Sequence, residues 1–141
     1  MEIYRVDARP IDVNEALMAI QDPAAGGQAV FLGTVRNEFE GRPSDGLFYE
    51  AYAPLAEKEM ARIGAEIRAE FGCLHVAMIH RVGELSVGEV AVVVAVSTAH
   101  RAEAFLASKA GIDRIKSRAP IWKKERWADG SAVWHHDPTA K

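Results

Sequence analysis

The sequence predicts an α+β fold in which a mainly antiparallel sheet is covered by two long helices and followed by a C-terminal hairpin. Three observations predict it. Apolar segments of strand length follow one another along the chain, two longer segments have helical spacing, and an Asp-Gly turn separates two short segments near the end. This order favours layers of sheet and helix over a repeating βαβ arrangement.

The composition of the chain is that of one globular domain covering residues 1–141. Of its 141 residues, 49% are hydrophobic and 26% are charged, and the formal net charge is −3. No run is apolar enough to span a membrane, the first residues lack a secretory pattern, and the single cysteine, Cys73, cannot form an internal disulfide. We therefore expect a cytoplasmic protein with no membrane partner. The acidic balance also argues against a surface that coats nucleic acid.

The beginning of the chain predicts a strand and a short helix. Residues 2–8 alternate between polar and apolar side chains, as in a half-buried strand. Residues 12–22 have the pattern of a helix with Asp12 as its N-cap and Glu15 three residues later, which is a capping-box spacing. The Pro-Ala-Ala-Gly-Gly segment that follows ends this helix.

Two strands, an exposed loop and a long helix are predicted next. Residues 29–37 form an apolar strand that runs into a polar loop, residues 37–46, whose Gly, Pro, Ser and Asp are typical of an exposed and mobile segment. Residues 47–52 return as a strand. Residues 54–71 then predict a helix that Gly72 ends. Its apolar residues recur at helical spacing: Leu55, Met60, Ile63, Ile67 and Phe71.

Two further apolar strands precede the second long helix. Residues 73–83 and 89–99 are joined through residues 84–88, and the second strand is apolar enough to be covered on both faces. We therefore expect it to be central in the sheet. Residues 100–118 predict the helix, which Pro120 ends. Three apolar residues are expected on one side of it: Phe105, Ile112 and Ile115.

The first strand of the C-terminal hairpin belongs to a strongly basic stretch. The Asp-Gly turn predicts that residues 121–127 pair with residues 132–136. Between Lys109 and Arg126 there are seven basic residues and two acidic ones, although the whole chain is acidic. The cationic character is therefore local, which indicates a site for an anion.

The common catalytic signatures are absent from the sequence. It has no phosphate loop, glycine-rich dinucleotide turn, nucleophile elbow or metal-ligand spacing, so we expect no metal and no bound cofactor. His75 and His80 would point to opposite faces of a strand, and we interpret both as packed or surface imidazoles. We interpret His135 and His136 as part of a solvated tail, and Cys73 as a small buried hydrophobe. Catalysis in this chain would have to use cations.

Three basic clusters stand at predicted element boundaries. Arg36 follows a strand, and His100 with Arg101 begins a helix, where positive side chains oppose the helix dipole. Such a placement favours a retained anion site that backbone N–H groups share. A solvated surface charge remains the alternative for each arginine taken alone. The third cluster consists of lysines: Lys116, Lys123 and Lys124.

Two lysines are predicted to face a common site. Pro120 fixes a bend between Lys116 and Lys123, so their side chains approach from its two sides. Arginine offers a planar fork for phosphate or carboxylate, and a lysine crowded by other cations can serve as a nucleophile or proton carrier. The set therefore suits a phosphorylated substrate. Trp122 is either a wall for a planar ring or a core residue, and Lys124 points to the other face of its strand.

Four segments together resemble a known family. "FLGTVRN", "IHRVGELSVGE", "VSTAHRAEAF" and "KSRAPIWKKE" are similar, in order and spacing, to the large catalytic subunit of molybdopterin synthase. The similarity extends from about the first strand to Trp127. It implies an α/β-hammerhead-like fold and a homodimer that binds one small ubiquitin-like sulfur-carrier subunit at each end, forming a heterotetramer.

The resemblance also implies a reaction. The carrier ends in Gly-Gly with a terminal thiocarboxylate, which enters a pocket of the large subunit. There, sulfur passes in two rounds to cyclic pyranopterin monophosphate and forms the dithiolene of molybdopterin. The basic stretch would then meet a thiocarboxylate and a pterin phosphate. The partner brings the sulfur, so the family needs no catalytic cysteine.

Site residues follow from the resemblance position by position. The implied catalytic residues are Lys116, which matches the lysine nearest the carrier's terminal glycine, and Lys123. His100 and Arg101 would bind the phosphate or pterin, within the chain or across the dimer, while Arg36 holds the phosphate. Which lysine orients the thiocarboxylate and which moves a proton stays open. The implied substrate-binding residues are Thr34, Val35, Arg36, His100, Arg101, Lys116, Lys123, Lys124 and Glu125.

Two other functions remain possible at this point. A non-catalytic RNA-binding or scaffold module could use the basic stretch with Trp122 and Trp127, although 8% aromatic residues provide little stacking surface. A phosphotransfer enzyme or hydrolase that acts alone would also suit a cationic pocket. Steeply salt-dependent RNA affinity would favour the first, and activity without a carrier would favour the second.

Overall fold

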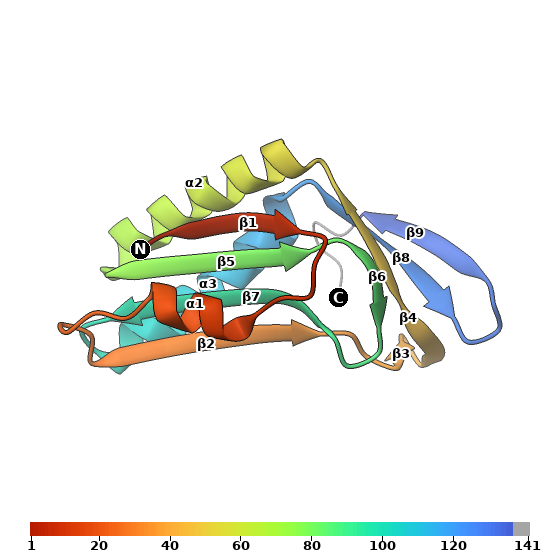
Figure 1. The fold of residues 1–141 in the computed structure, drawn as a ribbon, viewed down its shortest axis with the longest axis horizontal. Helices are drawn as coiled ribbons and strands as arrows, with labels where there is room; N and C mark the ends of the chain where they lie inside the picture. Colours follow the sequence, from red (N-terminus) through yellow and green to blue (C-terminus); the bar gives the residue numbers. More distant parts are fainter. Residues whose placement is uncertain (137–141) are drawn as a thin grey trace.

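The chain forms two β-sheets that meet near the end of its last helix (Figure 1). The computed structural model describes residues 1–136, and side chains as far as residue 132. The expectation for the side chains of His135 and His136 therefore lies outside the described residues. The strands are β1 (Ile3–Asp7), β2 (Gly27–Thr34), β3 (Glu38–Phe39), β4 (Arg42–Ala51), β5 (His75–Arg81), β6 (Gly83–Ser86), β7 (Val90–Thr98), β8 (Ile121–Trp127) and β9 (Ala132–His136), and the helices are α1 (Val13–Ala19), α2 (Ala53–Phe71) and α3 (Arg101–Arg118).

The first sheet has the strand order β1-β5-β7-β2. Only β1 and β5 run parallel among these strands, and the other pairs are antiparallel. Strand β7 lies inside the sheet, and all its residues after Val90 are buried. The predicted central strand is therefore confirmed, as is the mainly antiparallel α+β fold.

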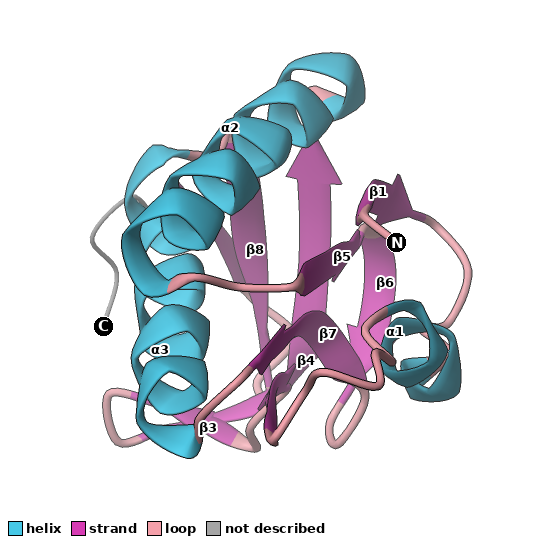
Figure 2. Ribbon diagram, turned by 90° about the vertical axis from the view of Figure 1, so that its left-hand side faces the viewer, coloured by secondary structure: helices cyan, strands magenta, loops and turns pink. Residues whose placement is uncertain are grey.

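Helices cover both faces of this sheet, as Figure 2 shows. Side chains of β7 alternate between the faces: Val93 packs with α1, whereas Val92 and Val94 pack in the cluster that contains α2 and α3. Helix α1 begins as predicted, because the Asn14 N–H donates to the Asp12 carboxylate at 3.0 Å. None of the helices in residues 1–136 combines the length and apolar character that crossing a membrane requires.

The two long helices agree with their predicted spans but not with every predicted core residue. Gly72 ends α2 in the left-handed conformation, with φ of 69°. Leu55 in the first turn of α2 is 50% exposed, and Phe105 in α3 is 69% exposed, so the apolar side of each helix is not buried along its whole length. Phe105 shares the side of α3 that carries the buried Ile112. In the described chain, however, β2 is the edge strand and no further strand covers Phe105.

The second sheet overturns the prediction of a mobile loop over residues 37–46. Most of that segment is a β-hairpin made by β3 and the first half of β4, with a turn at Glu40 and Gly41, which have φ of 51° and 81°. The Ser44 N–H donates to the Asn37 carbonyl at 2.9 Å. Its polar composition reflects the turn and an edge strand rather than mobility.

Strands β4, β6, β8 and β9 complete the second sheet. The predicted connection at residues 84–88 contains most of β6, which pairs with β4. The C-terminal hairpin is confirmed, because β8 and β9 pair antiparallel. Gly46 lies at an irregularity of β4 with φ of 150°, where an added Cβ would lie 2.4 Å from the Leu85 carbonyl oxygen. Glycine therefore lets β6 and β8 approach β4 from its two sides.

Ion pairs fix the end of α3 against α2. Arg118 donates to Glu59 at 2.7 Å and to both carboxylate oxygens of Glu66 at 2.8 Å. One turn earlier, Arg114 bonds Glu66 and Glu70 at 3.2 and 3.0 Å. Such a network holds its partners more firmly than isolated surface pairs do. The turn that leads into β8 therefore begins from a fixed point.

Candidate active site

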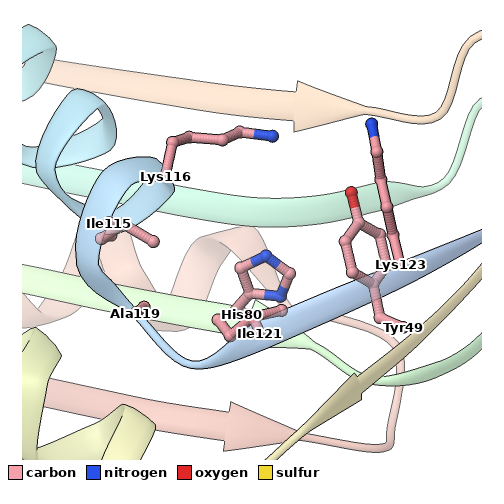
Figure 3. Close-up of a pocket in the computed structure, with 7 residues that line it drawn as sticks. All are labelled: Tyr49, His80, Ile115, Lys116, Ala119, Ile121 and Lys123. Atoms are coloured by element: carbon pink, nitrogen blue, oxygen red, sulfur yellow. The ribbon is translucent and has the colours of Figure 1, made fainter. Parts of the chain in front are cut away.

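A small pocket lies where the end of α3 meets β4, β5 and β8 (Figure 3). Its volume is about 20 Å³, which is room for about one water molecule. Two lysines and a histidine lie among apolar neighbours there. The lining residues are Tyr49, His80, Ile115, Lys116, Ala119, Ile121 and Lys123.

The bend at Pro120 brings the two lysines together, as the sequence predicts. Lys116 comes from the last turn of α3, and Lys123 is the third residue of β8. Between them, Ala119 leaves the helix in an extended conformation with ψ of 137°. Both side chains line the same pocket, and their amino groups point to the same side of it in Figure 3.

Lys123 is unusually enclosed for a lysine. It is only 8% exposed, and its Nζ lies 4.7 Å from the centre of the Phe39 ring, which provides a cation–π contact. Phe39 in turn packs on Trp127 with a distance of 6.1 Å between ring centroids. The β3–β4 hairpin thus covers this side of the lysine. A partly dehydrated ammonium attracts an anion more strongly than a solvated one does.

Lys124 and Glu125 do not line the pocket, although the resemblance assigns them to substrate binding. Lys124 lies on the opposite face of β8, in a groove of about 340 Å³ with Phe48 and Arg126. Glu125 shares the inner face with Lys123, but it is buried and accepts a hydrogen bond of 2.7 Å from the Ser44 hydroxyl. The alternation of β8 therefore separates the two adjacent lysines.

Thr34, Val35 and Arg36 lie at the end of β2 and also outside the pocket lining. Val35 is buried in the main hydrophobic core, and its backbone pairs with Gly88 and Glu89. Thr34 and Arg36 are exposed.

His100 and Arg101 lie at the opposite end of α3 from Lys116. They line a separate open hollow of about 480 Å³ together with Gly26. The 15 residues from Arg101 to Lys116 correspond to about 22 Å of helix. A single chain therefore does not bring all the predicted site residues together.

His80 and Tyr49 are pocket residues that the sequence analysis missed. The His80 side chain is 4% exposed, and its ring stands edge-on to that of Tyr49, with 4.9 Å between the centroids. Burial lowers the pKa of His80 to about 4, and the positive charge of Lys116 adds to this effect. One available signal was a single titratable residue at the end of the apolar run "VAMIH".

Cys73 lies outside this site. Burial raises the pKa of its thiol to about 11, and the thiol donates to the Ile67 carbonyl at 3.5 Å. Thiols act as nucleophiles in the thiolate form, which these surroundings disfavour. The interpretation of Cys73 as a small buried hydrophobe is confirmed.

Comparison with known proteins decides the family. A profile described as "MoaE protein" matches residues 6–118, which is most of the chain. The chain belongs to the MoaE protein family. A curated MoaE relative from Halalkalibacterium halodurans, the molybdopterin synthase catalytic subunit, is 43% identical over 134 residues, covering 95% of this chain and 85% of the relative. The human protein of the same name is 38% identical and covers 94% and 70% of the two chains.

Solved structures of the MoaE family agree with the fold. The crystal structure of molybdopterin synthase from Staphylococcus aureus matches with a TM-score of 0.88 and 38% identity, covering 94% of this chain and 96% of that one. A complex of subunits 1 and 2 of the molybdopterin-converting factor from Helicobacter pylori has a TM-score of 0.73 at 23% identity, covering 92% and 88% of the two chains, and supports the fold alone. These similarities confirm the predicted family and favour a sulfurtransferase over an RNA-binding module.

Proposed function

We propose that this chain is the catalytic subunit of a molybdopterin synthase. It transfers sulfur from the C-terminal thiocarboxylate of a small ubiquitin-like carrier to cyclic pyranopterin monophosphate. The observation that carries the proposal is the meeting of Lys116 and Lys123 in one pocket of a MoaE-family chain. Two ammonium groups among apolar walls suit a thiocarboxylate, which is a small anion on a flexible tail.

The two lysines have different tasks in the proposed reaction. The carrier sulfur bonds to a pterin carbon as the bond from that carbon to a cyclic-phosphate oxygen breaks, so the phosphate ring opens and the oxygen stays on the phosphate. The carrier is then joined to the pterin through a thioester. Water then attacks the thioester carbonyl, the carbon–sulfur bond to the carrier breaks, and the carrier leaves with an ordinary carboxylate while the sulfur stays on the pterin. Lys116 orients the thiocarboxylate and stabilises the oxyanion of this hydrolysis, and Lys123 moves the proton. A second round supplies the second sulfur.

The carrier is the source of sulfur in this proposal. The only cysteine of the chain is Cys73, and its buried thiol is unsuited to carry sulfur. The proposed reaction needs no bound cofactor, because the carrier and the pterin are both substrates. A free thiol also agrees with the cytoplasm as the place of action.

We further propose that two copies of the chain complete each site. His100 and Arg101 are too far from Lys116 to act in the same pocket, but they stand at one end of α3 and the neighbouring edge strand β2, and both elements carry exposed apolar residues. A second copy that covers these residues would carry its own His100 and Arg101 toward the neighbouring pocket, where they bind the pterin phosphate with Arg36. With a carrier on each chain, the assembly is a heterotetramer. The exposed apolar residues are Val30, Phe31, Leu32, Phe105 and Leu106.

Reconstitution tests the proposed function. The purified chain is incubated with the cyclic pterin and a thiocarboxylated carrier, and the dithiolene product is measured. Matched reactions omit the chain, use a carrier that lacks its terminal Gly-Gly, or use a carrier that ends in an ordinary carboxylate. We expect product only with the chain and the intact thiocarboxylate. Product formation with the truncated carrier would overturn tail insertion. Salt-dependent RNA binding without any sulfur transfer would favour the RNA-binding alternative.

A further inference from the structure

The protonation of the His80 ring can be derived from its hydrogen bond. Its Nδ1 lies 2.8 Å from the Arg81 backbone carbonyl oxygen, which can only accept a hydrogen bond. Nδ1 therefore carries the proton. Because burial keeps the imidazole neutral, Nε2 has no proton and is a hydrogen-bond acceptor.

This acceptor nitrogen faces the pocket. Figure 3 shows the ring of His80 below the side chain of Lys116, with Tyr49 between the ring and Lys123 and with one ring nitrogen on the side of Lys116. The titratable groups around the ring are Lys116 from α3, Lys123 from β8 and Tyr49 from β4, and Arg81 is its neighbour in β5. Nearly all these groups are cations or hydrogen-bond donors. An imidazolium there would be repelled, whereas a neutral acceptor is favoured.

We propose that His80 is a positioning residue of this site: its unprotonated Nε2 accepts a hydrogen bond from the Lys116 ammonium, directly or through one water, and holds Lys116 in the pocket. The catalytic consequence rests on the proposed function, but the contact itself does not. The pocket has room for about one such water. A lysine side chain has four rotatable bonds, so an acceptor at its end restricts its conformations more than apolar packing alone can.

The alternative is that His80 only fills space beneath the lysines. Two substitutions separate these roles, because an asparagine amide can replace the Nδ1 position of the ring and a glutamine amide can replace the Nε2 position. In His80→Asn the amide can still donate to the Arg81 carbonyl, but nothing replaces Nε2. In His80→Gln the longer side chain carries an amide oxygen near the former Nε2 position. A space-filling role predicts similar losses from both, whereas positioning predicts that only glutamine rescues turnover.

Steady-state kinetics with the full chain and carrier give the first readout. We expect His80→Asn to lower kcat by roughly 10- to 100-fold, the scale of a misplaced catalytic group. The KM for the carrier should stay unchanged, because His80 is buried beneath the lysines. His80→Gln should retain most of the wild-type kcat. Equal kcat values in both variants would overturn the inference.

Nuclear magnetic resonance of the histidine rings gives a second readout that needs neither carrier nor pterin. In the folded wild-type chain, His80 should have protonated Nδ1 and bare Nε2 at neutral pH. Lys116→Met should move the titration of His80 to higher pH, because a neighbouring positive charge is removed. The matched control is Lys124→Met on the opposite face of β8, which should leave this titration unchanged.

The two readouts also separate this inference from the proposed function. A protonated Nε2 would overturn the positioning contact even if sulfur transfer proceeds. The same holds if His80 titrates at the same pH in the wild type and in Lys116→Met. If the ring titrates as expected while the wild-type chain transfers no sulfur, the contact stands and the proposed function fails. If His80→Asn does not fold, the wild-type tautomer and the Lys116→Met titration still decide the matter.

Discussion

The two ends of α3 differ in how far the rest of the chain surrounds their basic side chains. At its C-terminal end, Arg114 and Arg118 bond carboxylates of α2, and Lys116 lines a narrow pocket between buried side chains. At its N-terminal end, His100 and Arg101 border an open hollow, and Phe105 is exposed one turn later. One end is organised by its own chain, whereas the other has exposed basic side chains beside an open hollow. This difference is what we expect if, as proposed above, the first end carries the reacting groups and the second end serves a neighbouring copy.

The largest expected effect is on product formation, at the C-terminal end of α3. Lys116→Ala and Lys123→Ala should each lower product formation by roughly 10²-fold or more, as happens when one preorganised electrostatic group is lost. Turnover is measured with saturating carrier, and circular dichroism checks that each variant folds. Lys124→Ala is the matched control, since Lys124 lies on the other face of β8 and should cause a milder loss. Near-normal turnover in both alanine variants would show that Lys116 and Lys123 take no part in the reaction.

A second, smaller effect tests the open end. Phe105→Glu should weaken association of the two copies by roughly 30-fold or more in Kd, the cost of losing a central aromatic anchor. Light scattering during size-exclusion chromatography measures the mass. Leu55→Glu is the control, because Leu55 is a comparably exposed apolar residue on α2. An unchanged mass for Phe105→Glu, or an equal change for Leu55→Glu, would place the interface elsewhere.

Mixing two weakly active variants tests whether Lys116 of one copy and Arg101 of the other form one site. Lys116→Ala and Arg101→Ala chains should each be weakly active alone. After dissociation and random reassociation, half of the dimers are mixed and each mixed dimer has one intact site, so about a quarter of the wild-type activity should return. Turnover is followed before and after mixing. Failure to regain activity, with mixed dimers demonstrated by mass spectrometry, would mean that both residues serve the same chain.

The last expected effect is on stability rather than on turnover or assembly: a pH dependence that arises at the C-terminal end of α3. Burial lowers the pKa of His80 to about 4 from the usual 6.5, so below pH 6.5 the unfolded chain takes up a proton that the folded chain does not. This contribution to the unfolding free energy is complete above pH 6.5 and is lost as pH falls toward 4, by at most about 1.4 kcal/mol per pH unit. Urea unfolding at several pH values measures it.

A substitution tests whether the buried His80 ring causes this pH dependence of the unfolding free energy. His80→Asn should reduce the acid slope of the unfolding free energy, because the titrating ring is gone. An acid slope in His80→Asn equal to that of the wild type would show that other groups cause it.

Local patterns predicted those parts of the site that one element determines. The opposite orientation of Lys123 and Lys124 follows from the alternation of a strand, and the bend before β8 follows from Pro120. His80 could not be assigned in this way. Its role depends on β5 lying beside the end of α3, and the residues that meet it are far from it in the chain.

Two departures of the structure from local sequence patterns have a similar origin. Residues 37–46 have a loop composition, yet pairing with other segments makes β3 and β4 from them, including the register of Ser44 with Trp127. Phe105 has the helical spacing of a core residue, but whether a residue of that face is buried depends on how far the sheet extends beneath it. In both cases tertiary contacts overrode a local signal.

The strict alternation of β8 also constrains how the gene can change. A single-codon insertion or deletion between Pro120 and Lys123 would turn the whole strand over, presenting Lys124 to the pocket and moving Glu125 and Trp127 to the outer face. One such event would remove Lys123 from the pocket and expose part of the core together. Individual substitutions along the strand carry no such penalty. We therefore expect related genes to differ by amino-acid substitutions in this segment but not by insertions or deletions.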